Sequence, residues 1–200
     1  LCKRLLEMDV PEMMASFLVE QRDMPWRHQL AYRRQLWDEA RHSMMGETAF
    51  MARGVDWTRI PLNIGFALRL GQHADAGERA LMLFAIEQSL MPADVGKRAE
   101  YETAVEAGDA LSAHFQDFDW ADEVLHTQIG RAWLKEAGLY GAGWREAAHA
   151  IHERTWTALD AYRDRQAQDP TWWRDLVRDL LGKESAVTEA ELRMPEVLAE

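Results

Sequence analysis

The chain has 200 residues, which we predict to form one domain, residues 1–183, followed by a C-terminal tail, residues 184–200. Its formal net charge is -11, and a negative surface repels nucleic-acid phosphates and anionic lipids, so we expect neither a nucleic acid nor a membrane as a partner. Cys2 is the only cysteine, which excludes an internal disulfide and a thiolate metal cluster and fits a cytoplasmic location. No apolar run approaches the ~20 residues that a membrane-spanning helix needs.

The spacing of apolar residues predicts helices along most of the chain and no strand. In chain order, helices are predicted for residues 3–21, 26–52, 75–107 with a kink or stop at Pro92, 109–137 and 144–166, with a shorter helix after Pro170. Residues 55–72, which contain Pro61 and Gly65, are predicted to form a long crossover with a short helix. This order is typical of an all-α four-helix bundle whose crossover joins the second and third helices, with extra C-terminal helices.

One pattern occurs twice inside the predicted helices: D-E-x-x-H-[S/T]-x-x-G begins at Asp38 and again at Asp122. Residues three apart share a helix face, so Glu39 points the same way as His42, and Glu123 the same way as His126. A carboxylate and an imidazole on one turn can bind a transition-metal ion. Two such turns that face each other can hold two ions when neighbouring helices supply further carboxylates.

The length of the repeated pattern makes it specific. A bare E-x-x-H is a weak signal, because a third copy exists at Glu146 and His149, where Arg145 and Glu153 stand in place of the flanking Asp and Gly. The alternative interpretation is a pair of salt-bridging turns on the surface. The apolar residues that surround both long copies disfavour that alternative.

The flanking positions of the repeat also have physical uses beside a metal. A metal-bound imidazole usually donates its other N–H to a carboxylate, and we predict that Asp38 and Asp122 do this for the histidine of the opposite helix. Gly46 and Gly130 follow one turn beyond each histidine. A glycine inside a helix costs ~1 kcal/mol relative to alanine, so we expect a close helix contact or open space beside the metals there.

Two further carboxylates are predicted to complete the metal site. Glu87 is the only charged residue in the apolar run ALMLFAIEQSLM, where an ionised carboxylate needs a partner or a metal. A surface pairing of Glu87 with an arginine is the alternative. On the first helix Glu12 is the predicted ligand, and Glu7 and Asp9 remain alternatives because all three lie near the level of the repeat.

The remaining histidines are assigned minor roles. Glu146 and His149 are expected well along the bundle from the metals, as a solvated or interhelical pair. His152 lies nearer the right level and is a candidate for a supporting contact. His28, His73 and His114 are expected to be ordinary polar residues.

These residues resemble the ferritin-like di-iron carboxylate superfamily. DEARH, Asp38 to His42, resembles the D-E-x-R-H turn of bacterial di-iron monooxygenases, whereas DEVLH has Leu125 in place of the arginine. DEVLHTQIGRAWL followed by a glycine-containing turn is similar to poorly characterised ferritin-like proteins related to di-iron tRNA hydroxylases. The resemblance covers roughly residues 5–137. It implies a ferritin-like bundle and a ligand set that includes Glu39, His42, Glu87, Glu123 and His126.

The function expected from this site is oxidation of an unidentified organic substrate by O2, at two iron ions and with an external electron donor. Mn/Fe and Mn/Mn are alternative metal pairs, and a homodimer is an alternative to a monomer. A ferroxidase or other iron-handling protein is the second hypothesis, which the crossover and the extra C-terminal helices disfavour. A metal-free bundle that binds a partner is the third, which the duplicated turn disfavours.

Overall fold

The computed structural model describes residues 7–59 and 65–163, and this part of the chain is all-helical, as predicted. It contains seven α-helices, one 3₁₀ turn and no strand. Their bounds, in chain order, are α2 Asp9–Glu20, α3 Trp26–Ala52, η1 Trp57–Arg59, α4 Gly65–His73, α5 Ala76–Ser89, α6 Lys97–Glu106, α7 Ala110–Glu136 and α8 Trp144–Arg163. Within the described ranges, none of these helices combines the length and the apolar character needed to cross a bilayer.

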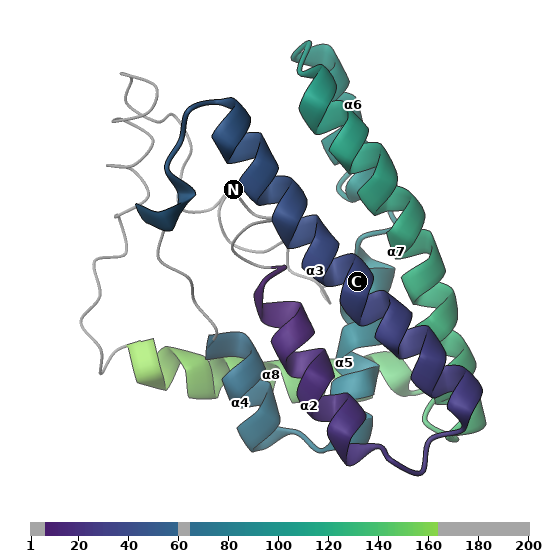
Figure 1. The fold of residues 1–200 in the computed structure, drawn as a ribbon. Coiled ribbons are helices and arrows are strands. Elements are labelled where there is room, and N and C mark those ends of the chain that lie inside the picture. Colours follow the sequence, from purple (N-terminus) through teal and green to yellow (C-terminus); the bar gives the residue numbers. More distant parts are fainter. Residues whose placement is uncertain (1–6, 60–64, 164–200) are drawn as a thin grey trace.

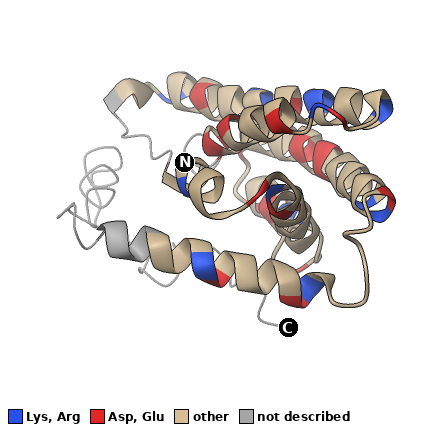
Figure 2. Cartoon of the chain, turned by 90° about the horizontal axis from the view of Figure 1, so that it is seen from below, with Lys and Arg blue, Asp and Glu red and all other residues tan. Residues whose placement is uncertain are grey.

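Four helices pack in a closed ring, because α2 contacts α3, α3 contacts α7, α7 contacts α5, and α5 contacts α2 (Figure 1). The connection from α3 to α5 runs through η1 and α4, and α4 packs against α2 and α8. Helix α8 crosses the lower end of the ring and packs against α4 and α5 (Figure 1). Lys and Arg positions are spread over several helices (Figure 2).

The apolar core forms because each helix of the ring turns one apolar stripe inward. On α2 that stripe is Met13, Met14 and Phe17, all at most 1% exposed. Phe17 meets Tyr32 of α3 edge-to-face, with ring centroids 5.0 Å apart. Phe84 of α5 closes the other side of the core.

Most described helix ends lie within a residue or two of the predicted ones, but α2 begins only at Asp9, because Glu7 and Met8 of the first predicted helix form a turn. Asp75 caps α5 with a capping box, in which its side chain accepts from the Glu78 backbone N–H and the Glu78 side chain accepts from that of Asp75. The Asp109 side chain accepts from Ser112 N and caps α7. The predicted helix after Pro170, the predicted tail and residues 3–6 of the first predicted helix lie outside the described residues.

Helix α5 stops before Pro92, and the chain resumes as a helix at Lys97. The backbone N–H of Lys97 donates to the carbonyl of Leu90 at 3.0 Å, which closes the intervening loop. A Cβ atom at Gly96 would lie 2.1 Å from the Leu90 carbonyl oxygen, so only glycine allows this closure. The loop therefore sets where α6 begins and where Lys97 lies.

Candidate metal centre

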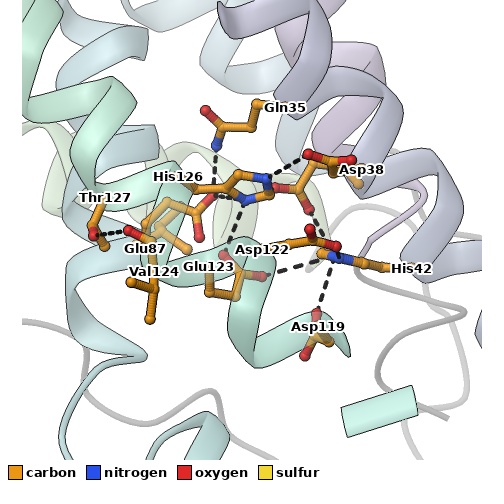
Figure 3. Close-up of polar contacts among 12 residues, drawn as sticks. Gln35, Asp38, His42, Glu87, Asp119, Asp122, Glu123, Val124, His126 and Thr127 are labelled. Atoms are coloured by element: carbon orange, nitrogen blue, oxygen red, sulfur yellow. Dashed lines mark hydrogen bonds and ion pairs between the residues drawn. The ribbon is translucent and has the colours of Figure 1, made fainter. Parts of the chain in front are cut away.

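The two copies of the repeated turn face each other across α3 and α7. Glu39, His42, Glu123 and His126 are each at most 2% exposed. Nδ1 of His126 lies 3.2 Å from Oε2 of Glu123 on its own turn and 3.1 Å from Oε1 of Glu39 on the opposite helix. The imidazole ring centroids are 6.0 Å apart. Carboxylate and imidazole donors from both helices thus meet at one buried place (Figure 3).

Each histidine turns its second nitrogen to an aspartate on the opposite helix (Figure 3). Nε2 of His42 lies 3.0 Å from Oδ2 of Asp122, and Nε2 of His126 lies 3.5 Å from Oδ2 of Asp38. A carboxylate can only accept, so the proton sits on Nε2. In both residues Nδ1 is the atom that faces the other carboxylates, so Nδ1 is the nitrogen that could bind a metal once its proton is displaced.

The aspartates are themselves held in place by Arg41. Its guanidinium donates to Oδ1 of Asp38 at 3.1 Å and also to Oδ2 of Asp122. One side chain therefore links the two carboxylates that orient the two histidines. Arg41 belongs to the first copy of the repeat only, since Leu125 stands at the equivalent place in the second.

Glu87 joins the same site from α5. It is 3% exposed, and its Oε1 accepts from the Gln35 side-chain amide at 2.9 Å. The same oxygen lies 3.8 Å from Nδ1 of His126. The alternative pairing with an arginine on the surface is therefore not what this carboxylate does.

The predicted first-helix residue, Glu12, is corrected by the structure. Helix α2 turns Met13 and Met14 into the core, which leaves the Glu12 side chain exposed to solvent. Glu7 instead reaches the site, with Oε2 at 3.3 Å from Nδ1 of His42. Asp9 is buried, but its carboxylate accepts from backbone N–H groups at the start of α4, at 3.1 and 3.2 Å, and so caps that helix.

Two residues of the site were missed by the sequence analysis. Asp119 is fully buried, with Oδ1 at 3.0 Å from Nδ1 of His42. Lys97 is 3% exposed and extends its Nζ to Oδ2 of Asp119 at 2.8 Å, Oε1 of Glu7 at 3.2 Å and Oε1 of Glu123 at 3.4 Å. Asp119 was detectable, because it precedes Glu123 by one helical turn on the same face. For Lys97 no local pattern gives a signal.

The donor atoms fall into two groups that share Glu123. One comprises Glu7, His42, Asp119 and Glu123, and the other Glu39, Glu87, Glu123 and His126. Within each group one ligand atom per residue lies within 4.8 Å of all the others. This is the spacing at which several donors can surround one ion.

The charges of the site oppose one another in the metal-free chain. Burial disfavours the imidazolium of His42, but the carboxylates of Glu39, Glu7 and Asp119 outweigh it and raise the pKa of His42 to about 11. Burial likewise opposes protonation of His126, yet Glu123 and Glu39 raise its pKa to about 10. Both imidazoles are therefore positively charged in the metal-free chain, and a metal ion that binds Nδ1 would have to displace the proton on that nitrogen.

The two coupled carboxyls shift in opposite directions. Burial, together with the charges of Glu123 and Glu39, holds the pKa of Glu87 well above its usual range. Burial would also raise the pKa of Glu123, but the hydrogen bond from Glu87 and the positive charges of Lys97 and His126 hold it well below. Glu87 is thus the protonated member of the pair and Glu123 the ionised one.

The residues present fit a pair of divalent ions. Five carboxylates line the two groups, namely Glu7, Glu39, Glu87, Asp119 and Glu123. With all five carboxylates ionised and Lys97 protonated, the net charge of these six side chains is four negative charges. Two divalent cations would balance this charge. In addition, Nδ1 of His42 forms no hydrogen bond with any described residue, although carboxylate oxygens approach it to between 3.0 and 3.8 Å. Oxygen and imidazole donors that converge in this way suit iron or manganese.

The other histidines lie outside both groups. Glu146 and His149 are exposed on α8, and His152 packs on Trp156 of the same helix, with ring centroids 4.5 Å apart. His28 is buried against Glu136, with Nε2 at 2.7 Å from Oε2. The predicted supporting role for His152 is therefore not seen.

The glycine beyond the second histidine makes a close contact, as one of the two predicted reasons requires. A Cβ atom at Gly130 would lie 3.0 Å from the side chain of Phe84 on α5. The absence of a side chain at Gly130 therefore lets the phenyl ring of Phe84 pack directly against α7.

Comparison of the chain with protein-family models, with curated proteins and with solved structures gives no match.

Proposed function

We propose that this chain is a ferritin-like di-metal carboxylate oxidoreductase, which binds two iron ions and uses O2 to oxidise an organic substrate. The observation that carries the proposal is the meeting of two duplicated Glu-x-x-His turns, from α3 and α7, at one buried place. The ring of α2, α3, α5 and α7, with the connection between α3 and α5, supports a ferritin-like bundle with a crossover.

The charge of the site supports metal binding over a purely structural role. Buried carboxylates repel one another and lose their hydration, which opposes folding. In the metal-free chain Lys97 and the protonated imidazoles offset part of this cost, and divalent ions would offset the rest. Five carboxylates around two imidazoles are consistent with a site shaped for cations.

In this proposal Nδ1 of His42 and Nδ1 of His126 would each bind one metal, and Glu123, which belongs to both donor groups, could serve either ion. Glu87 and Glu39 would complete the position beside His126, and Glu7 and Asp119 the position beside His42. Two ferrous ions would supply two of the four electrons that reduce O2 to water, the organic substrate would supply the other two, and an external electron donor would return the irons to the ferrous state. The protein side chains hold the ions, and the Asp38–Arg41–Asp122 link keeps both imidazole rings oriented.

The test is metal content followed by O2 consumption. The chain purified without chelator should carry close to two iron or manganese ions, and the anaerobic Fe(II) protein should consume O2. His126→Ala should lose most of this reaction, because one ion loses its only nitrogen ligand. His149→Ala is the matched control, since that histidine is exposed on α8 and should leave the reaction unchanged.

Two results would change the proposal. Loss of the reaction in His149→Ala with a silent His126→Ala would exclude the repeated turn as the site. Oxidation of many iron atoms per chain with deposition of mineral would favour iron storage over substrate oxidation.

A further inference from the structure

The two donor groups differ in one cation. Lys97 Nζ lies within 3.4 Å of carboxylate oxygens of Glu7, Asp119 and Glu123, which belong to the group around His42. In the group around His126, neither Glu39 nor Glu87 forms an ion pair with a lysine or arginine of the described chain. That group has a neutral neighbour instead, the Gln35 amide that donates to Glu87.

The difference follows from equivalent positions in the repeat. Gln35 precedes Glu39 by four residues, and Asp119 precedes Glu123 by four residues. The neutral amide and the aspartate therefore occupy the same place, one turn before the repeated glutamate. The closed loop at Gly96 then brings the Lys97 ammonium to the copy that has the aspartate.

The lysine changes what each group offers to an ion. An ammonium about 3 Å from three carboxylates already neutralises part of their charge, and it repels a second cation placed among them. It is also buried, so water does not screen this repulsion. Of the carboxylates in the group around His126, only the shared Glu123 lies beside this ammonium.

Building on the proposed function, we propose that the two metal positions are unequal. The position formed by Glu39, Glu87, Glu123 and His126 binds an ion first and tightly. The position formed by Glu7, His42, Asp119 and Glu123 binds its ion weakly as long as Lys97 is present. Lys97 thus controls the step from one bound ion to two.

The test is a titration of the full chain with Mn(II), followed by calorimetry and by the electron paramagnetic resonance signal of free Mn(II). The wild type should bind one ion tightly and a second one weaker by on the order of tenfold or more. Lys97→Met should tighten the second ion until the two affinities approach each other. Lys135→Met is the matched control, because it removes an exposed lysine near the end of α7 and should leave both affinities unchanged.

The histidine pair locates the tight ion without changing Lys97. His126→Ala should lose the tight ion, whereas His42→Ala should keep it and lose only the weak one. This comparison decides the matter even if Lys97→Met fails to fold.

The outcomes separate the two proposals. A wild-type chain that binds no Mn(II) and no Fe(II) would overturn the di-metal function together with this inference. Two ions of equal affinity in the wild type, or loss of the tight ion in His42→Ala, would overturn the inequality alone and leave the di-metal function standing.

Discussion

Replacing Glu87 with glutamine should stabilise the metal-free protein and weaken the metal-bound one. Glu87 is buried, and its raised pKa favours the protonated carboxyl in the folded chain. Glutamine has the same shape. Its carbonyl oxygen can accept from Gln35, and its amide can donate to Glu123, so Glu87→Gln retains both contacts without the cost of protonation.

The magnitude follows from proton linkage. The ordinary pKa of this carboxyl is 4.5. Each pH unit between that value and the raised pKa costs about 1.4 kcal/mol, so at pH 7 the protonation of Glu87 lowers the free energy of unfolding by at most about 3 kcal/mol. We therefore expect Glu87→Gln to raise the melting temperature in chelator at pH 7, by up to about 10 °C.

The pH dependence has a definite sign. A group whose pKa is raised in the folded state contributes most stability below its unfolded pKa and loses that contribution as the pH rises towards the folded value. The advantage of Glu87→Gln should therefore shrink to under about 1 kcal/mol at pH 5. Denaturant unfolding of both proteins in chelator, at pH 5 and at pH 7, measures this difference in the free energy of unfolding.

With metal present, Glu87→Gln should have the opposite effect and make the protein less stable than the wild type. An ion at one hundred times its dissociation constant stabilises the wild type by about 2.7 kcal/mol, and Glu87→Gln should lose most of this because one ligand is missing. Glu12→Gln is the control, an exposed Glu-to-Gln change that should stay within about 0.5 kcal/mol and keep the metal response. A Glu87→Gln protein that is less stable than wild type in chelator at pH 7 would refute the reasoning. It would mean that Glu87 is ionised and favourably paired.

Three further predictions concern the metal, the packing and a helix cap. Metal loading at pH 7.5 should release protons, including those of His42 and His126, because their pKa values of about 11 and 10 keep both imidazoles charged before the metal binds. Calorimetry in buffers of different ionisation enthalpy measures the released protons, and a binding heat that does not depend on the buffer would contradict the prediction. Gly130→Ala should lower stability by roughly 1 kcal/mol, since overpacking of about 1–3 kcal/mol exceeds the gain in helix propensity, whereas Gly71→Ala, with no atom within 4 Å of its added Cβ, should raise stability by up to about 1 kcal/mol. Urea unfolding compares the two, and the prediction is wrong if both alanines act alike. Asp109→Ala should destabilise the chain by about 1 kcal/mol at pH 7, because it removes the side-chain cap of α7. The backbone N–H of Ser112 lowers the pKa of Asp109, so the destabilisation should fade below pH 4, where this carboxylate becomes protonated. A loss of stability that stays constant from pH 7 to below pH 4 would count against the cap.

Much of the helical layout could be predicted from the sequence, because helix periodicity and end signals are local. The predicted bounds of α3 match the structure, and Asp75 and Asp109 cap the helices that they were expected to start. The inward face of the repeat was equally predictable, since residues three apart on a helix share a direction whatever the helix packs against. Glu87 was detectable because a lone carboxylate in an apolar run has few ways to be satisfied.

Tertiary structure alone decided which residues from other elements reach that face. Glu7, Asp9 and Glu12 lie close together in sequence, but the angle at which α2 meets α3 leaves Glu12 in solvent and brings Glu7 to His42. Lys97 enters through a loop whose closure depends on contact between Gly96 and Leu90. Such placements depend on how helices cross and where loops return, and these follow from the packing of the whole chain.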